Sequence, residues 1–493
     1  MKIQLKKYFF CKLQIGLIGV VLIFLLGSCK EGTNAITVSK KPNIILLLAD
    51  DLGYGDLGCF KGDAFTPNLD GLANDGIKFT NFYAAAPNCS PSRTGLLTGR
   101  SPSKVGVYNY IPPVHTMYLR AEEITIAEIL KGEGYRTGHF GKWHLSNLDS
   151  TEMKQPSPFD QGFDYSLGTT NNAQPSHLNP KNFVRNGERL GVVEGYSCDI
   201  VVDEALKWVG SKKADPFFMY IAFHEPHKIV ASPPALVANY PTFPQKDAEY
   251  LANVENMDAA IGRLLDSLSI RGLNENTLIV FASDNGSYRN GSNGPLLGGK
   301  SFVYEGGIRV PGIIHWKGQI KEGITINTPV GLIDLMPTIC EIVNVDHPKP
   351  ELLAGENIVP VFNGNNFKRE IPLSWFFYRT SPEIAMRIDN YSILGKSRDT
   401  IKVTHQFSKP DMDHIRSLQL DEFEVYDLNV DISQEEKIDY RSLDNGEEYK
   451  GMIIRQLSDI QREGYYWDTL PPVKGAKKLK SNWRQLRPTG FSN

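Results

Sequence analysis

The sequence is poor in cysteine and has little net charge. Its 493 residues include six cysteines and no CxxC pair, which argues against a disulfide scaffold and a cysteine zinc site. The formal net charge of −3 gives no basic field that would favour nucleic acid as a partner. No internal repeat is found. The 41% hydrophobic and 22% charged residues are ordinary for a globular protein, and the length predicts a large domain with a smaller one.

The N-terminus has the pattern of a bacterial export signal. A lysine-rich start precedes an apolar run at 15–26, which is too short for an ordinary membrane span. The next residues, Leu26-Gly27-Ser28-Cys29, resemble a lipobox, in which cleavage leaves Cys29 as a lipidated N-terminus. A plain secretory signal and a retained anchor are the alternatives. We therefore expect an exported, lipid-anchored protein of the cell envelope, in the periplasm or at the cell surface.

Apolar runs and their periodicity predict an α/β fold. Residues 42–49 and 277–282 are continuous apolar runs, typical of central parallel strands. Between them, apolar residues recur at helical spacing from 251 to 268, which predicts a helix whose apolar stripe belongs to the core. From about residue 371 the pattern changes to short alternating strands with turns. We expect a signal at 1–29, a tether at 30–40, a catalytic domain at 41–370 and a C-terminal subdomain at 371–493. The cysteines Cys59, Cys198 and Cys340 are expected as free thiols, with one disulfide among them as the alternative.

Acidic and amide side chains follow both predicted strands. Asp50 and Asp51 end the first, and Asp284 and Asn285 follow the second. Carboxyl ends of parallel strands are where α/β sheets place their sites, and adjacent acids repel unless a cation lies between them. An all-oxygen set favours a hard cation, calcium rather than zinc, although each motif by itself is also typical of a turn.

Cationic residues are predicted around this site. Cys89 precedes Pro91 at a predicted helix start, whose N–H groups favour an anion, and Arg93 follows one turn later. Lys142 and His144 are two apart on an extended segment and point the same way. A divalent cation with several basic side chains neutralises a small tetrahedral oxyanion, which favours sulfuryl or phosphoryl transfer.

The stretch from Cys89 to Arg100, CSPSRTGLLTGR, matches the signature C-x-P-S-R-x-x-L-L-T-G-R without a gap. It resembles the type I sulfatases of the alkaline phosphatase superfamily. Residues 134–144 resemble their second signature, G-Y-x-T-x-x-x-G-K-x-H, and residues 305–311 resemble their E-G-G-x-R-V-P segment. The resemblance covers roughly residue 41 to the C-terminal strands. It implies a large, mostly parallel central sheet flanked by helices and a small C-terminal antiparallel sheet, packed by a helix at 451–462.

The resemblance also implies a mechanism. A sulfatase-maturating enzyme converts Cys89 into Cα-formylglycine (3-oxoalanine), whose hydrate is the nucleophile, and one calcium ion is held by Asp50, Asp51, residue 89, Asp284 and Asn285. Asp284 takes the proton of the nucleophile and Arg93 steadies it. Lys142 and Lys300 bind the sulfate oxygens. His224, in His224-Glu225-Pro226, is the acid for the leaving alcohol, and His144 is the base that releases sulfate.

We expect the substrate of such an exported polysaccharide sulfatase to be a sulfated carbohydrate: an algal polysaccharide (ulvan, carrageenan or fucoidan) or a glycosaminoglycan. Loop positions favour Tyr108, Tyr110, His177 and His227 as residues of a sugar subsite, and structural packing is an equal alternative for His227. Two other functions are weighed: a phosphatase, phosphodiesterase or phosphonate hydrolase of the same superfold, and a catalytically inactive glycan-binding lipoprotein.

Overall fold

A computed structural model describes residues 40–470, apart from 113–114, 147, 149–154, 211–215, 289–290, 366 and 399–406. The predicted signal, Cys29 and almost all of the tether lie outside the described residues. Within them, no helix combines the length and hydrophobicity needed to cross a membrane. The described residues belong to one compact unit.

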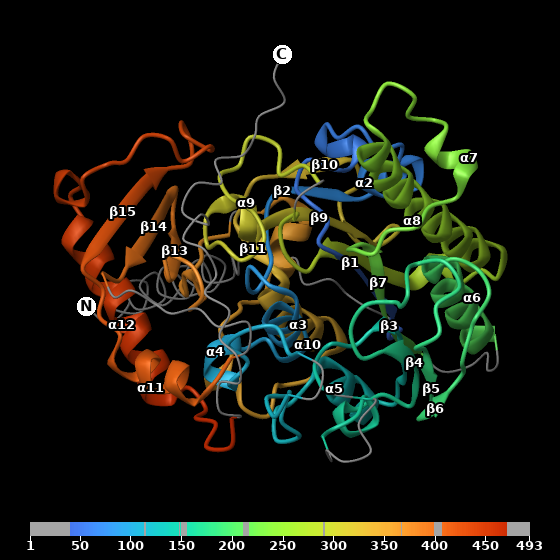
Figure 1. The fold of residues 1–493 in the computed structure, drawn as a ribbon, viewed down its shortest axis with the longest axis horizontal. Coiled ribbons are helices and arrows are strands. Elements are labelled where there is room, and N and C mark those ends of the chain that lie inside the picture. The colour runs from blue at the N-terminus through green and yellow to red at the C-terminus, as the bar shows by residue number, and fades with distance from the viewer. Residues whose placement is uncertain are drawn as a thin grey trace, which may run out of the picture. The chain divides into compact units, whose positions relative to one another are not determined.

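An eleven-stranded sheet forms the centre of this unit (Figure 1). Its strand order is β10-β2-β9-β8-β1-β7-β3-β4-β5-β6, with β11 beside β2. The five strands from β8 to β4 are parallel, whereas β9, β5 and β6 pair antiparallel. The strands are β1 (Asn43–Asp50), β2 (Ile77–Tyr83), β3 (Arg136–Lys142), β4 (Tyr165–Thr169), β5 (Val184–Arg185), β6 (Glu188–Arg189), β7 (Phe217–Pro226), β8 (Thr277–Ser283), β9 (Arg309–His315), β10 (Ile324–Ile326) and β11 (Val330–Gly331).

Helices pack against this sheet in two groups of mutual contacts. The first contains α2 (Pro67–Asn74), α6 (Ser197–Gly210), α7 (Pro234–Val237) and α8 (Gln245–Ile270). The second contains α3 (Cys89–Thr98), α4 (Pro102–Val105), α5 (Ile126–Gly132) and α10 (Leu335–Val343). The short α9 (Glu305–Ile308) leads directly into β9.

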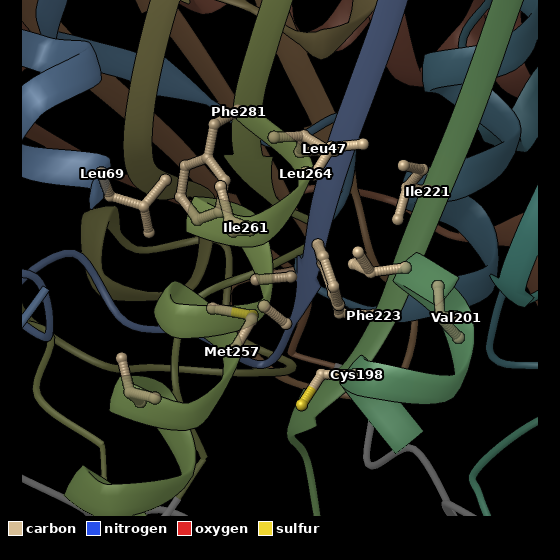
Figure 2. Close-up of a cluster of buried hydrophobic side chains, with 14 of the residues drawn as sticks. Leu47, Leu69, Cys198, Val201, Ile221, Phe223, Met257, Ile261, Leu264 and Phe281 are labelled. Carbon is tan, nitrogen blue, oxygen red and sulfur yellow. The ribbon is translucent and has the colours of Figure 1, made fainter. Parts of the chain in front are cut away.

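The core lies between the sheet and the first group of helices. Figure 2 shows Leu47 of β1 and Ile221 of β7 facing the α8 residues Met257, Ile261 and Leu264. All five are fully buried. Burying one such side chain stabilises the fold by about 1.5–3 kcal/mol. The contact therefore holds β1 and β7 in place against α8, and with them the carboxyl ends of both strands. The predicted apolar stripe along α8 is therefore core, as expected.

A separate antiparallel sheet of four strands follows toward the C-terminus. It consists of β12 (Leu373–Phe376), β13 (Ile384–Ile388), β14 (Tyr391–Lys396) and β15 (Glu422–Asp427), and two further helices are α11 (Lys409–Ser417) and α12 (Gly446–Glu463). Helix α12 packs on β13 and β14 and contains the predicted helix at 451–462. The Trp375 indole donates a 2.7 Å hydrogen bond to the Ala84 carbonyl, which joins this sheet to the main body. The predicted fold class is confirmed.

Candidate active site

The predicted acidic residues meet at the carboxyl ends of β1 and β8. Ala49 pairs with Ser283 in the parallel register, so the residues that follow both strands lie at the same level. The Asp51 amide donates a 3.1 Å hydrogen bond to Asp284 Oδ1, and Asn285 Nδ2 donates to Asp51 Oδ1 at 2.8 Å. Asp51 has a φ of 65°, which turns the chain sharply out of the strand. All of these side chains are buried.

Cys89 begins helix α3 beside this group. One ligand atom each from Asp50, Cys89 and Asp284 lie within 4.8 Å of one another. Burial raises the pKa of the Cys89 thiol to about 11, although Lys142 and Lys300 act in the opposite direction. The unmodified thiol is therefore protonated near neutral pH, and a protonated thiol is a poor nucleophile.

Two buried oxygens in the cluster fit a cation. Asp50 Oδ1 and Asn285 Oδ1 have no hydrogen-bond partner among the residues that the structure describes. Buried polar atoms are normally paired, so two unpaired acceptors in a group of three carboxylates and one amide indicate a hard, oxygen-coordinated cation. Burial alone would raise the pKa of the Asp50 carboxyl, but Lys142, His227 and Arg93 hold it well below its ordinary value, so Asp50 is an anionic donor.

Arg93 ties the cluster to helix α3. Its Nε and one terminal nitrogen donate to Asp284 Oδ2 at 3.0 and 2.8 Å, and the other nitrogen donates to the Lys142 carbonyl at 2.9 Å. The same guanidinium lies 3.7 Å from Asp50 Oδ1. Because Arg93 is fully buried, it fixes β3, β8 and α3 relative to one another at their functional ends.

Two lysines add positive charge at the cluster. Lys142, the last residue of β3, is fully buried and donates to Asp50 Oδ2 at 2.7 Å. Lys300 donates to Asp51 Oδ1 at 2.6 Å and to Cys89 Sγ at 3.1 Å, and its side chain is 12% exposed. The two amines and the N-terminus of α3 thus surround the position of residue 89 with hydrogen-bond donors, as an oxyanion site requires.

His144 presents a proton acceptor in the same region. Its Nε2 pairs with the Ile111 carbonyl at 3.1 Å, and since a carbonyl only accepts, Nε2 carries the hydrogen. Nδ1 is buried without a partner in the described part of the chain. Burial, and then Lys142 and Arg93, hold the pKa of His144 well below its ordinary value. The neutral ring therefore offers an unpaired lone pair on Nδ1.

The structure separates the two histidines at the end of β7. His224 is fully buried, pairs with Thr169 Oγ1 at 2.8 Å and packs its ring against Phe183. His227 is 11% exposed, and its Nε2 lies 3.5 Å from Asp51 Oδ2. The spacing of the two histidines in the sequence does not predict which of them is accessible to solvent, because this depends on how the loops fold over the end of the strand. Only His227 has both an accessible face and a position at the cluster.

Two residues expected in a sugar subsite are packed inside the protein. His177 is fully buried, with Nδ1 3.2 Å from Asn253 Oδ1. Tyr108 is almost fully buried, donates to the Tyr465 carbonyl at 3.1 Å and stacks on Phe407. Neither side chain is placed to contact a sugar, so the expectation from their loop positions is wrong. Tyr110 stays half-buried near the cluster.

A family model described as Sulfatase matches residues 42–345, more than half of the chain. The chain belongs to the sulfatase family. A second model, described as N-sulphoglucosamine sulphohydrolase, C-terminal, matches residues 297–444. This sulfatase is 34% identical to human Arylsulfatase A over 379 residues, 71% of this chain and 72% of that protein. It is 32% identical to canine N-acetylgalactosamine-6-sulfatase over 397 residues, 73% of each chain.

A solved structure gives a similar result. Ps i-CgsB in complex with k-i-k-neocarrahexaose superposes with a TM-score of 0.74 at 27% identity, covering 86% of this chain and 94% of that one. The protein is therefore a sulfuric ester hydrolase, and the predicted enzyme class is confirmed. The described residues contain four cysteines, and all four are free thiols. This was expected for Cys59, Cys198 and Cys340, and the fourth is Cys89.

Proposed function

We propose that this sulfatase removes sulfate from a carbohydrate, with residue 89 as formylglycine and one calcium ion at Asp50, Asp51, Asp284 and Asn285. The observation that carries the proposal is the position of residue 89. It lies at a helix N-terminus, within one cluster of acidic oxygens and beside the Lys300 amine. When present, formylglycine hydrate supplies a hydroxyl nucleophile and the cation neutralises sulfate charge.

The basic residues then bind and orient the sulfate group. Lys300 and Lys142 reach the cluster through carboxylate contacts of 2.6 and 2.7 Å, so both amines are positioned to exchange those contacts for sulfate oxygens. Burial raises the pKa of Asp284 to about 6, and Arg93 acts against this shift while its two hydrogen bonds hold the carboxyl group in place. Such prearranged donors stabilise the charge that develops on the transferred group. His144 Nδ1, buried and unpaired within the described chain, accepts a proton at the step that releases sulfate.

His227 protonates the leaving alcohol in this proposal, in place of His224. Its Nδ1 donates to the Lys228 carbonyl at 2.6 Å, so Nε2 is the atom that faces Asp51 and the cluster, and it acts as an acid only when the ring carries a second proton. Burial lowers the pKa of His227 to about 4, while the carboxylates of Asp51 and Asp50 act in the opposite direction and favour the protonated ring. Its partial exposure leaves room for a leaving group to depart, whereas His224 is enclosed by Thr169 and Phe183. We assign His224 to the support of the strand end.

The names of the relatives support a carbohydrate substrate. N-acetylgalactosamine-6-sulfatase is 32% identical, and Ps i-CgsB is solved with a neocarrahexaose. A further solved relative, PsFucS1 sulfatase from Pseudoalteromonas sp., shares 25% identity at a TM-score of 0.70, over 87% of this chain and 92% of that one. We further propose export, anchoring through lipid on Cys29, and maturation of Cys89 by a sulfatase-maturating enzyme, supported by the sequence motifs.

The test begins with co-expression of the chain and a maturation enzyme. Mass spectrometry of the peptide with residue 89 should show a loss of about 18 mass units, the change from a cysteine to an aldehyde side chain. Sulfate release is then measured by ion chromatography on carrageenan, fucoidan, ulvan and chondroitin sulfate, with Cys89→Ala as the matched control. Sulfate release by the Cys89→Ala variant, or a matured enzyme that releases no sulfate from any of them, would contradict the proposal.

A further inference from the structure

Tyr110 is fixed beside the catalytic cluster by its neighbour in the chain. The Ile111 amide donates a 3.0 Å hydrogen bond to Ser90 Oγ, and the Ile111 carbonyl accepts the 3.1 Å bond from His144. Tyr110 is therefore one residue away from a segment bound to both sides of the site. Burial raises the pKa of its hydroxyl, and Arg379 acts against this shift through its charge and a hydrogen bond.

Arg379 reaches the same place from the C-terminal sheet. It lies in the turn between β12 and β13, and its guanidinium carbon is 5.6 Å from the centre of the Tyr110 ring. The hydroxyl of the next residue, Thr380, donates to the Ser301 carbonyl. Ser301 follows Lys300 directly, so the turn that carries Arg379 is attached to the loop that carries a sulfate-binding lysine.

A second contact ties this loop to the nucleophile. Asn88 Nδ2 donates to Ser301 Oγ at 3.2 Å, and Asn88 directly precedes Cys89.

Tyr110 and Arg379 are both half-buried, which leaves part of each side chain accessible at the edge of the site. The nearby carboxylate of Asp411 accepts hydrogen bonds from the Ser408 amide and hydroxyl, which end-cap α11. The pair thus offers an aromatic face and a guanidinium next to the sulfate-binding position.

We propose that Arg379 and Tyr110 form a subsite for a second anionic group of the substrate, with the sugar ring against the Tyr110 face. The group is a second sulfate ester or a carboxylate on the same or the adjoining sugar, since both present two anionic oxygens that the two N–H groups of a guanidinium edge can bind. This inference rests on the proposed carbohydrate sulfatase function and specifies which substrates it prefers.

The experiment compares matured wild type with Arg379→Met, Arg379→Lys and Tyr110→Leu. The substrates are 4-nitrophenyl sulfate, a monosulfated neutral disaccharide, a disulfated neutral disaccharide and a monosulfated disaccharide with a uronic acid. Losing one charge-assisted hydrogen bond should raise KM by about 10- to 100-fold for a substrate with two anionic groups, with kcat changed little. Comparing the KM increase for the disulfated disaccharide with that for the uronic acid disaccharide shows whether the subsite binds a sulfate or a carboxylate. Arg379→Lys keeps a positive charge, so its KM should lie between those of wild type and Arg379→Met.

Arg398→Met is the matched control, because it removes an exposed arginine that follows β14 in the same sheet and should leave every KM unchanged. Equal KM increases on all four substrates, or no increase on either two-anion substrate, would overturn the subsite. Wild type that is inactive on every substrate, with residue 89 matured, would instead overturn the proposed function. Equal thermal unfolding midpoints of the variants establish that a KM change is not a folding defect.

Discussion

The assignment of the acid to His227 predicts a specific kinetic signature for His227→Gln. Glutamine keeps most of the side-chain volume but cannot transfer a proton, so the chemical step loses general-acid catalysis, which contributes about 10²- to 10⁴-fold. The loss should depend on the leaving group, because a poor leaving alcohol needs a proton and an acidic phenol does not. Turnover of 4-nitrophenyl sulfate should therefore fall much less than turnover of an alkyl or sugar sulfate.

His224→Gln gives the contrasting expectation. It breaks the 2.8 Å hydrogen bond to Thr169 Oγ1 inside a fully buried site, which costs about 1–3 kcal/mol of unfolding free energy. Any loss of activity should then be similar for all leaving groups. The assay measures kcat/KM for a series of aryl sulfates whose phenols rise in pKa, together with metal content, since His227 lies near Asp51. A steeper dependence in His224→Gln than in His227→Gln, at equal metal content, would refute the assignment.

Three further predictions concern charge inside the fold. Arg93→Met leaves the Asp284 carboxylate buried without its partner and should lower the free energy of unfolding by about 3–5 kcal/mol in urea titrations; a loss below about 1 kcal/mol would show that the pair is not needed. Burial lowers the pKa of His139 to about 3, so the folded state stays neutral while the unfolded state takes up a proton below about pH 6.5. Stability should fall by about 2 kcal/mol between pH 7 and pH 5 from this group, a fall that His139→Gln should remove in urea titrations at the two pH values. Finally, chelation with EGTA should abolish sulfate release and lower the thermal unfolding midpoint; calcium should restore both, and full activity after exhaustive chelation would argue against the metal.

Local patterns were sufficient to predict the strand ends and the core. The apolar runs at 42–49 and 277–282 correspond to the buried parallel strands β1 (Asn43–Asp50) and β8 (Thr277–Ser283), and they can be recognised without information from distant parts of the chain. Parallel register then brings Asp50 and Asp284 together, because their strands are neighbours in the sheet. The helical stripe of α8 was recognisable for the same reason: its period depends only on helix geometry.

Local patterns could not predict which loop side chains are accessible at the site. Tyr108 and Tyr110 are two apart, yet one packs against Phe407 and the other faces Arg379. His224 and His227 differ in the same manner. Whether a loop side chain is enclosed or accessible depends on elements that reach it from distant parts of the chain, here β4 and the C-terminal sheet. The contacts of His224 with Thr169 and of Tyr110 with Arg379 join residues far apart in the chain, so no periodic pattern in the sequence predicts them.

The C-terminal sheet consequently has a role in the site as well as in stability. Ser301 has a φ of 75°, an unfavourable value for a residue with a side chain, and its amide donates to the Pro87 carbonyl at 2.6 Å. The Thr380 hydroxyl holds its carbonyl and Asn88 holds its hydroxyl. Three contacts thus keep the backbone next to Lys300 in one conformation, and one of them comes from the turn that carries Arg379. A change in that turn would alter both the proposed contact of Arg379 with the substrate and the support of Lys300. A substitution there should therefore change substrate specificity and catalysis together.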